Sequence, residues 1–520
     1  MTDYREANLQ TILANDNDEI KLLIKDEKQL NSVYDFVIRQ FEKVKITFIT
    51  QTDRYLDDSS LTLHTKGASL RIRQSSPQQL ALNLKIKKQD SITGTDAIYK
   101  RREIKHNLTD VQFSSLMSNA SIDIIVPDFC SLLRSVLSLP LIILEKKFDI
   151  TTSRTEVLVE NGESEFRFHF DTMVYTIVDK EITFYEMEIK VSTSEYQDLN
   201  ILQNLLNEFN LVRWGKSKYD RGIYLYKREN SKATNIPMDE IATKFFLSTE
   251  QVDMLKKHSR ILQDVYRDYI LHKPYFSREV KLIHNELQVL LIDDEQWDST
   301  TIERKHVHSI RPRVKIADHV IVKIIRREDK AREDGVHKYF NSDNTIGNAK
   351  YGQLTVDNYK SILTDLIGLR VLHLFKSNWL EIDEQLTDLY KEKIVEKRFY
   401  VRKGDEIQGQ DELKSEVESR RFTFIEKESG YRSAHYLIKR DVYVDSGEVF
   451  TAYAEIQVRT VFEEAWGEVD HEIRYPHYDK DININHFLKT FNRIAGSADE
   501  MASFIKIYRD SLLNRRCVLR

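Results

Sequence analysis

Several short segments in the first half of the chain alternate strictly between apolar and charged residues, and this alternation restricts the fold more than any other feature. In SLRIRQ, Leu70 and Ile72 alternate with Arg71 and Arg73, and DEIKLLI, LNLKIK and FYEMEIKV follow the same pattern. Successive side chains of a strand point to opposite faces, so each segment predicts a strand with one apolar and one charged face. Residues 15 to 225 are therefore expected to form an antiparallel sheet.

The charged faces of these strands suit a polyphosphate. Glu186 and Glu188 lie two residues apart, and carboxylates at this spacing can hold a hard divalent cation. Arg and Lys pairs at the same spacing on two other strands can bind phosphate oxygens. A sheet closed with this face inside would form a tunnel for a metal-bound polyphosphate, whereas an open sheet would simply expose it to water. The pattern alone leaves both open.

The order of the segments resembles the CYTH, or triphosphate tunnel metalloenzyme, family. DEIKLLI stands at the family's first acidic strand, and TDRYLDDSSLTLHTKGASLRIR, LNLKIK, YKRREIK, FYEMEIK and GKSKYDRG follow in the family's order. The resemblance implies a β-barrel tunnel that binds a triphosphate, with Mg²⁺ or Mn²⁺ as cofactor. The implied triphosphate-binding residues are Lys21, Arg71, Arg73, Lys85, Arg102, Arg154 and Lys218. The implied metal ligands are Glu19, Glu186 and Glu188.

One position departs from the family. Its first strand reads Glu-x-Glu-x-Lys, whereas Lys21 is preceded here by Glu19 and by Asn17. An amide is a poorer ligand for Mg²⁺ or Mn²⁺ than a carboxylate, although Asp16 or Asp18 would compensate in a shifted register. We therefore expect this domain to bind a triphosphate, and the sequence leaves open whether it hydrolyses the ligand or only senses it.

The whole chain has the length and composition of a multidomain globular protein. Its 520 residues are 41% hydrophobic and 31% charged, with 7 Pro and 15 Gly, and its net charge of −5 gives no general attraction to polyanions. No apolar run reaches the roughly 18 residues of a membrane span, and the N-terminus lacks a signal pattern, so we expect a cytoplasmic protein with no membrane partner. Two cysteines give no disulfide framework.

Three motifs in the second half suit the transfer of a phosphoryl-type group to a nucleotide hydroxyl. An acid in the apolar run TDLIGLRVLHLF, Asp365, either needs a cation, such as a metal ion, or lies at the end of the strand, because a lone buried carboxylate is costly. In AEIQVRT, Glu455 shares one strand face with Gln457 and Arg459. Asp365 and Glu455 could share a Mg²⁺, and Glu455 could accept the hydroxyl proton. The loop KESGYRSAHY offers Tyr431 for a base and Lys427, Arg432 and His435 for phosphate oxygens.

These segments, in this order, resemble the synthetase domain of the RelA/SpoT family, the (p)ppGpp synthetases. RVK at 313–315 resembles its Arg-x-Lys segment, DLIGLR at 365–370 its Asp-x-x-Gly-x-Arg strand, GYRSAH at 430–435 its Gly-Tyr-x-Ser-x-His loop and EIQVRT at 455–460 its catalytic strand. AWGEVDHEIRY resembles the helix that follows. The resemblance implies an ATP-dependent pyrophosphokinase that transfers the β,γ-pyrophosphate of ATP to a ribose 3′-hydroxyl of GDP or GTP and releases AMP.

The resemblance also assigns roles at this second site. The implied ATP-binding residues are Arg313, Lys315, Lys323 and Arg326. The implied acceptor-binding residues are Lys427, Tyr431, Arg432, Ser433 and His435. The implied catalytic residues are Asp365, Glu455, Gln457 and Arg459, with Asp365 and Glu455 as ligands of Mg²⁺.

The acceptor is left open by a second departure. Many guanine-using members carry Pro-Lys-x-Asn before Gly-Tyr, whereas this chain has Lys427-Glu428-Ser429. The family also contains toxic synthetases that modify adenine nucleotides or the 3′ end of tRNA, and the basic stretch EKRFYVRKGD could bind RNA or form a solvated loop. A third alternative is a nucleotide sensor in which neither site turns over.

The expected organisation is α+β and multidomain. The second half should be a nucleotidyltransferase-like mixed sheet flanked by helices, under the control of the triphosphate-binding domain. The last helices could also form contacts in a homo-oligomer. The expected boundaries are a tunnel domain at 1–228, a linker at 229–240, a helical segment at 241–300, the synthetase domain at 301–478 and C-terminal helices at 479–520.

Overall fold

The computed structural model divides the chain into two compact units. Unit 1 contains Met1–Asn230 and Asp445–Gly447, and unit 2 contains Ser231–Val444 and Glu448–Arg520. None of the helices in the described part of the chain combines the length and apolarity of a membrane span. The structure describes residues 19–41, 44–76, 79–87, 101–117, 126–127, 144–161, 164–192, 205, 207–231, 235–292, 307–333, 339–340, 354–402, 410–428, 430–473 and 481–518.

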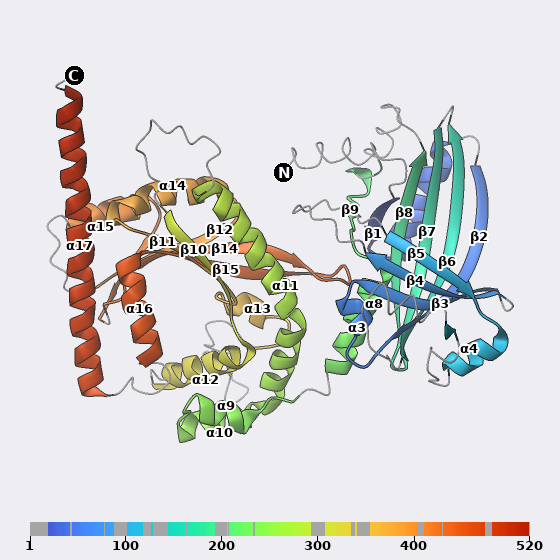
Figure 1. The fold of residues 1–520 in the computed structure, drawn as a ribbon, viewed down its shortest axis with the longest axis horizontal. Coiled ribbons are helices and arrows are strands. Elements are labelled where there is room, and N and C mark those ends of the chain that lie inside the picture. Colours follow the sequence, from blue (N-terminus) through green and yellow to red (C-terminus); the bar gives the residue numbers. More distant parts are fainter. Residues whose placement is uncertain are drawn as a thin grey trace. The chain divides into compact units, whose positions relative to one another are not determined.

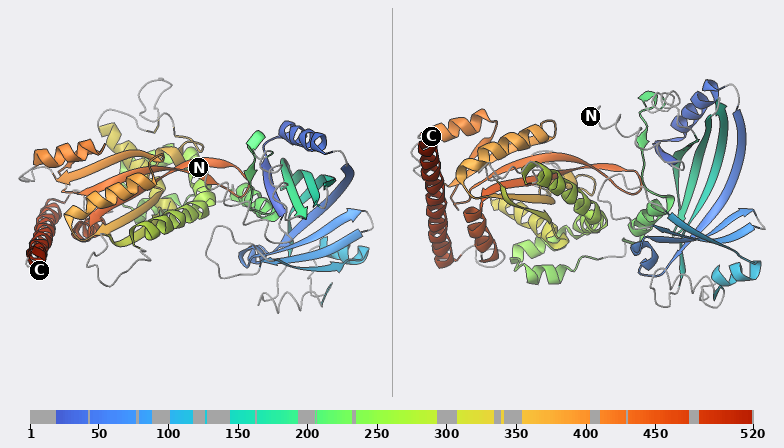
Figure 2. Two further views of the ribbon diagram at one scale, coloured as in Figure 1. Left: turned by 90° about the horizontal axis from the view of Figure 1, so that it is seen from above. Right: turned by 45° about the horizontal axis from the view of Figure 1, so that its top comes forward.

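Unit 1 is built on one nine-stranded sheet in the order β5-β4-β3-β2-β6-β7-β8-β1-β9. Every pairing is antiparallel, as the alternation predicted. Strands β3, β4 and β5 run across the direction of β6, β7 and β8, so the sheet folds over itself (Figures 1 and 2). The strands are β1 (Glu19–Ile24), β2 (Val44–Asp57), β3 (Ala68–Ser76), β4 (Gln79–Lys87), β5 (Arg101–Asn107), β6 (Glu145–Asn161), β7 (Ser164–Ile177), β8 (Lys180–Ser192) and β9 (Val212–Arg213).

The predicted barrel is not closed by strand pairing within the described residues. Strands β5 and β9 are the two edges of the sheet, and no hydrogen-bonded ladder joins one edge to the other. The antiparallel class is thus confirmed, while the enclosure of a tunnel depends on the fold of the sheet and on the helices beside it.

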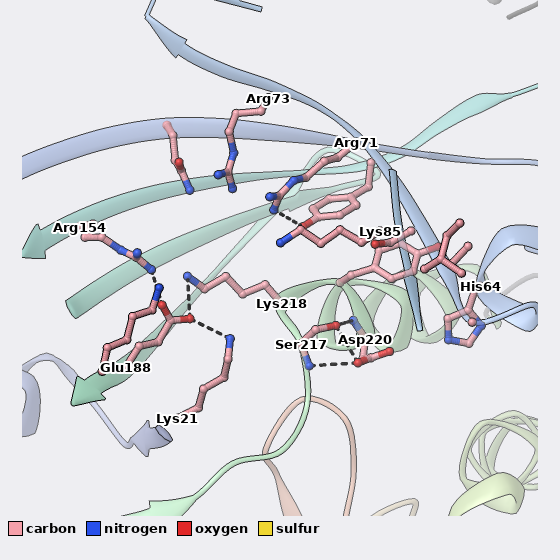
Figure 3. Close-up of a pocket in the computed structure, with 18 residues that line it drawn as sticks. Lys21, His64, Arg71, Arg73, Lys85, Arg154, Glu188, Ser217, Lys218 and Asp220 are labelled. Atoms are coloured by element: carbon pink, nitrogen blue, oxygen red, sulfur yellow. Dashed lines mark hydrogen bonds and ion pairs between the residues drawn. The ribbon is translucent and has the colours of Figure 1, made fainter. Parts of the chain in front are cut away.

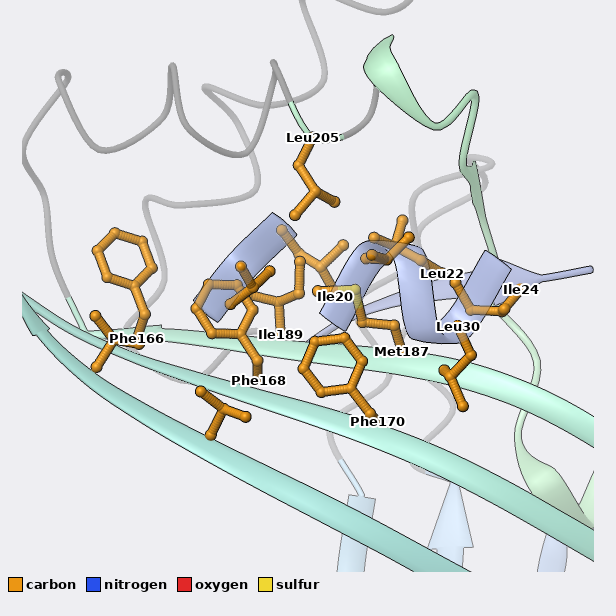
Figure 4. Packing of buried hydrophobic residues seen from close by; sticks show 14 residues of the cluster. Ile20, Leu22, Ile24, Leu30, Phe166, Phe168, Phe170, Met187, Ile189 and Leu205 are labelled. Atoms are coloured by element: carbon orange, nitrogen blue, oxygen red, sulfur yellow. The ribbon is translucent and has the colours of Figure 1, made fainter. Parts of the chain in front are cut away.

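The apolar face of the sheet packs against helix α2 (Glu27–Gln40). Asp26 caps this helix, because its carboxylate accepts a hydrogen bond of 2.8 Å from the backbone N–H of Gln29. The buried residues Leu30, Val33 and Val37 lie along one side of the helix and join a cluster that includes the strand residues labelled in Figure 4. Because side chains alternate along each strand, burying this face turns the charged side chains to the other.

The other helices described in unit 1 are α3 (Thr62–Thr65), α4 (Asp110–Met117) and α8 (Lys218–Asn230). Helix α4 packs on the apolar side of β3 and β4 through Leu116, whereas α3 and the start of α8 carry residues that lie on the charged side. The N-terminus of α8 is held by a local pair of hydrogen bonds. The Ser217 hydroxyl lies 2.7 Å from Asp220 Oδ2, and it accepts the backbone N–H of Asp220 at 3.1 Å. This cap fixes the first residue of α8, Lys218, at a definite position.

Unit 2 contains a six-stranded mixed sheet in the order β10-β11-β15-β14-β12-β13. The pairs β11–β15 and β12–β13 are parallel, and the other pairs are antiparallel. The predicted mixed sheet flanked by helices is confirmed. The strands are β10 (Val307–Val314), β11 (Ile367–His373), β12 (Ile394–Arg402), β13 (Thr423–Lys427), β14 (Ser433–Tyr443) and β15 (Val449–Thr460).

Helices flank this sheet, and the longest described ones are α11 and α17, of 33 and 37 residues. Helix α11 packs on β10 and β11, and α16 packs on α17 (Figure 1). The helices are α9 (Met238–Lys244), α10 (Thr249–Lys257), α11 (Ser259–Leu291), α12 (Ala317–Glu333), α13 (Tyr359–Ile362), η2 (Lys376–Asn378), α14 (Trp379–Leu389), α15 (Gln410–Ser419), α16 (Val461–Ile473) and α17 (Ile482–Val518).

Candidate functional site

A cavity of about 300 Å³ lies over the charged face of the unit 1 sheet. Figure 3 shows its basic side chains converging from several strands and from the start of α8. Most of the predicted triphosphate-binding residues therefore line one cavity. These are Lys21, Arg71, Arg73, Lys85, Arg154 and Lys218.

The pairing of β6, β7 and β8 places an acidic cluster beside this cavity. Arg154 on β6 is opposite Asp171 on β7, and Asp171 is opposite Glu186 on β8. Directly opposed residues of an antiparallel pair project to the same face, so the three side chains form one row. One ligand atom from each of Asp171, Glu186 and Glu188 can be chosen so that all lie within 4.8 Å of one another, and all three residues are buried. Asp171 was not predicted, although HFDTM alternates like the other strands.

Internal cations neutralise this cluster. Arg154 forms two hydrogen bonds of 2.7 and 2.6 Å with Asp171 and a third of 2.6 Å with Glu188. Lys21 lies 2.8 Å and Lys218 3.7 Å from Glu188 (Figure 3). Lys218 also forms an ion pair with Asp171. Ligand phosphates would have to compete with carboxylates for the same cations.

The three carboxylates differ in their proton affinity. Burial raises the pKa of Glu188, but Lys218, a hydrogen bond from His169 and the other cations outweigh it and hold the pKa well below its usual range. Burial likewise opposes ionisation of Asp171, whose pKa is nevertheless lowered, chiefly by Lys218 and Arg154. At Glu186, burial prevails and raises the pKa.

The oxygens of Glu186 identify where a cation fits. Neither oxygen has a hydrogen-bond partner among the described residues, and the nearest cationic groups, on Arg221 and Lys21, lie 3.4 and 3.8 Å away. Buried carboxylate oxygens without hydrogen bonds beside two further carboxylates form a donor set that suits Mg²⁺ or Mn²⁺. The predicted ligand Glu19 begins β1, but its side chain lies outside the described residues, as do Asn17, Asp16 and Asp18.

At the other wall of the cavity, Asp53 on β2 organises the predicted arginines of β3. Arg73 donates two hydrogen bonds of 2.8 Å to Asp53, and Arg71 donates one of 3.2 Å. The Asp53 carboxylate holds both guanidinium groups at the cavity. The sequence analysis had not singled it out. For the predicted Arg102, only the backbone position opposite Ile86 is described.

The second site lies on the unit 2 sheet, where β15 carries three polar residues on one face. Ala454, Ile456 and Val458 are buried between them, as the alternation predicted. Gln457 donates a hydrogen bond of 2.8 Å to Glu455 Oε2, and Arg459 donates one of 3.2 Å to Gln457 Oε1. The three polar residues form a chain that orients the Glu455 carboxylate.

His435 on β14 contacts the other oxygen of Glu455, at 3.1 Å from Nδ1 to Oε1. The Tyr431 hydroxyl lies 2.8 Å from Nε2 of the same ring. Burial raises the pKa of Tyr431 to about 12, so its hydroxyl keeps its proton and can donate to Nε2. Nδ1 then carries the ring proton and donates a hydrogen bond to Glu455. Although burial opposes ionisation of Glu455, His435 leads the groups that lower its pKa.

Asp365 lies two residues before β11, which runs parallel to β15. Its Oδ2 atom is 3.0 Å from Lys315 Nζ and also pairs with Lys323. These lysines lower the pKa of Asp365 despite burial. Burial lowers the pKa of Lys323 to about 8. Asp365 Oδ1 is buried and has no hydrogen-bond partner among the described side chains, so it can accept a cation.

The two other residues predicted to bind ATP, Arg313 and Arg326, have different surroundings. Arg313 lies on β10, and it contributes with Lys315 to a pKa of about 4 for His319, which is lowered mainly by burial. Arg326 donates a hydrogen bond of 2.9 Å to the carbonyl of Phe245, the residue that follows α9.

The predicted acceptor loop, which we define as residues 430–435 and whose last three residues begin β14, is more enclosed than the sequence suggested. Arg432 pairs with Glu463 of α16 at 3.0 Å, and the buried Ser433 hydroxyl donates to the Val458 carbonyl at 3.2 Å. Lys427 is exposed, and its ammonium group lies 5.2 Å from the ring centre of Tyr400. Tyr400 was missed by the sequence analysis, yet its ring lies 4.7 Å from that of His435.

The described part of the basic stretch considered for RNA, residues 396–402, is not a continuous cationic surface, and Lys403 lies outside the described residues. Lys397 is buried, lies 2.5 Å from Asp383 and stacks on Phe422 at 4.2 Å. Arg398 is paired with Glu396 on the same strand. The prediction of a solvated loop or an RNA contact is therefore wrong for Lys397. Side chains alternate between the two faces of β12, and the side chain of Lys397 lies on the buried face.

Comparisons with known proteins match two regions of the chain. Residues 16–224 match the family model of the CYTH domain, and residues 312–480 match the model described as a region found in RelA / SpoT proteins. No curated protein sequence matches significantly.

Solved structures with some similarity include proteins of both kinds. Small alarmone synthetase 1 from Bacillus subtilis has a TM-score of 0.31 and 18% identity, covering 46% of this chain and 95% of its own. A GTP pyrophosphokinase family protein from Streptococcus pneumoniae has a TM-score of 0.31 and 22% identity, covering 48% and 95%. A candidate adenylate cyclase from Bacillus halodurans has a TM-score of 0.28 and 19% identity, covering 39% and 94%.

Proposed function

Because the chain joins a CYTH domain at residues 16–224 to a RelA/SpoT region at residues 312–480, we propose that it is an alarmone synthetase with a triphosphate-binding domain. The reaction transfers the β,γ-pyrophosphate of ATP to the 3′-hydroxyl of GDP or GTP. The bond between the acceptor 3′-oxygen and Pβ forms, the bond between Pβ and the oxygen bridging to Pα breaks, and AMP leaves.

The observation that carries this proposal is the hydrogen-bonded chain around Glu455. A general base must be ionised and aimed at the proton it takes. His435 and Gln457 fix the two oxygens of Glu455, and the lowered pKa keeps the carboxylate charged at neutral pH. Glu455 can accept the proton of the acceptor hydroxyl, and His435 and Tyr431 hold its geometry while it does so.

The ATP side of the site is supplied by the lysines around Asp365. In the ligand-free arrangement, Lys315 and Lys323 are both paired with this carboxylate. A bound polyphosphate offers them oxygens with more charge, so they can exchange one anion for another. A Mg²⁺ held by Asp365 and Glu455 would neutralise the charge of the transferred group. The free Oδ1 of Asp365 fits that role.

In the CYTH domain we propose that a triphosphate binds along the six predicted cations that line the cavity, with Asp171, Glu186 and Glu188 as ligands of a divalent cation. The ligand then controls the synthetase activity. Each basic residue already has an anionic neighbour or another interaction in the ligand-free domain, so binding exchanges internal ion pairs for phosphate contacts.

Pyrophosphate transfer is tested with purified protein, Mg²⁺ and ATP labelled on the γ-phosphate. The acceptors are GDP, GTP, deacylated tRNA or none, and Glu455→Gln is the control. Label on GDP or GTP that disappears in the control supports the proposal. Label on tRNA or on a second ATP would show that the acceptor is tRNA or an adenine nucleotide and not a guanine nucleotide. Absence of transfer, with tripolyphosphate both present and absent, would reject the catalytic proposal.

A further inference from the structure

Helix α17 (Ile482–Val518) reaches the acceptor loop, although the helix begins after residue 480, where the match to the RelA/SpoT model ends. The contact is made by Asn492, which is 1% exposed. Its Nδ2 atom donates a hydrogen bond of 3.0 Å to the Gly430 carbonyl, and its Oδ1 atom accepts one of 3.4 Å from Arg432. One amide therefore holds the residue before Tyr431 and the residue after it.

The backbone at Gly430 shows how closely the loop and the helix pack. Gly430 has a φ of +86°, which a residue with a side chain rarely adopts. A Cβ atom at this position would lie 2.4 Å from Asn492 Oδ1. One turn along the helix, a Cβ at Gly496 would lie 3.3 Å from the Arg432 guanidinium. The loop and α17 thus use two glycines to approach each other.

The same side of α17 also contacts the end of the catalytic strand. Thr460, the last residue of β15, donates a hydrogen bond of 3.1 Å to Asp499 and accepts one of 3.2 Å from the backbone N–H of Glu463. Glu463 pairs with Arg432 at 3.0 Å. Asn492 and Asp499, seven residues apart, are two turns apart on one helix face.

We propose that Asn492 is a positioning residue, through which α17 sets the orientation of Tyr431 for the acceptor nucleotide. Resting on the proposed function, this inference assigns control of acceptor binding to a helix that lies beyond the matched region. Tyr431 lies between two residues that Asn492 holds by hydrogen bonds, so Tyr431 loses little further conformational freedom when a base binds to it. These hydrogen bonds therefore reduce the entropic cost of acceptor binding. ATP binding, which uses the lysines near Asp365, does not depend on it.

The direct test is amide hydrogen exchange of a peptide that covers residues 430–436, without nucleotides. Asn492→Ala should raise its exchange at least threefold, while Lys489→Ala, an exposed change one turn earlier on the same helix, should not. Unchanged exchange in Asn492→Ala would overturn the inference. This readout does not require activity, so it remains decisive even if the wild-type protein transfers no pyrophosphate and the proposed function fails.

Where the wild type is active, steady-state kinetics provide the second readout. Asn492→Ala should raise the KM for the acceptor about tenfold, a loss typical of one buried hydrogen-bonded group, and change the KM for ATP less than twofold. Asn492→Asp keeps the acceptor for Arg432 but loses the donor to Gly430, and should raise the acceptor KM as well. Equal increases in both KM values, or a fall in kcat alone, would show a general structural role and overturn the inference.

Discussion

The His435 ring and the Glu455 carboxylate are joined by a contact of 3.1 Å, although the two residues lie on different strands and twenty positions apart. Their strands pair in an antiparallel register that places His435 opposite Gln457, so the contact to Glu455 is diagonal. This relationship makes the protonation of Glu455 depend on His435.

Replacing His435 with Ala should shift the acidic limb of the kcat profile to higher pH. Burial raises the pKa of Glu455 and the contact with His435 lowers it, so loss of the ring lets burial dominate. Protonated Glu455 cannot accept the hydroxyl proton, and activity should fall about tenfold for each pH unit below the new pKa. Initial rates between pH 5 and 9 measure this. An unshifted limb in the variant would show that His435 does not set the charge of Glu455.

The pKa of about 8 at Lys323 predicts where kcat/KM for ATP begins to fall on the alkaline side of its pH profile. As pH rises through this value, Lys323 loses the charge that would hold an ATP phosphate, so kcat/KM for ATP should fall. Lys323→Arg keeps its charge throughout this range and should remove the limb. The measurement is kcat/KM for ATP at saturating acceptor from pH 7 to 10. A limb that persists in the arginine variant would assign it to another group.

Glu463 should make unit 2 less stable as pH rises from about 4.5 to 7. Burial raises its pKa to about 7, despite the pair with Arg432. The folded state then binds more protons than the unfolded chain in this window, so the free energy of unfolding falls with rising pH, by at most about 3.4 kcal/mol.

Denaturation of wild type and Glu463→Gln at pH 5 and pH 7 checks the sign. The wild type should lose stability between these values, and the uncharged variant should lose less. A larger loss in the variant would contradict the raised pKa.

Arg71→Ala together with Arg73→Ala should weaken tripolyphosphate binding to unit 1 at least a hundredfold. Two charge-assisted contacts of roughly 1.5 to 3 kcal/mol each would be lost. The matched control is Arg167→Ala on β7, whose partly exposed guanidinium pairs with Glu165 outside the cavity lining. Isothermal titration calorimetry with Mg²⁺ present measures the affinity. Equal affinity in the double variant and the control would place the ligand elsewhere.

Exposed apolar residues on α17 predict that two copies of the protein associate through this helix. Apolar residues recur at alternating intervals of four and three, the heptad pattern of a coiled coil. Several are largely exposed, including Phe487 at 73% and Ile505 at 59%. A second copy of the helix, with the same repeat, is the partner that this spacing fits. The positions are Ile484, Phe487, Phe491, Ile494, Ala498, Met501, Ile505, Tyr508 and Leu512.

Light scattering coupled to size-exclusion chromatography tests this association across a concentration range. Ile494→Glu with Ile505→Glu should convert the oligomer to a monomer, because two charges enter the seam. Lys489→Glu, off the seam, should leave the mass unchanged. A wild-type mass equal to 61.4 kDa at every concentration would exclude the seam as a self-association surface.

The sequence by itself determined the strand faces and the order of the two domains. Alternation is local, since each side chain's face follows from its neighbours, and it correctly separated Ala454 and Ile456 from Glu455 and Gln457. The motifs also carry their own order, which is why both families were recognisable from short segments.

Only the tertiary structure decided which side chains meet. Asp171 joins Glu186 because β7 and β8 pair in one register, and a shift by one residue would send it to the apolar face. Asn492 reaches Gly430 across 62 positions of the chain. Such contacts depend on packing between distant segments, and local periodicity contains no information about that packing.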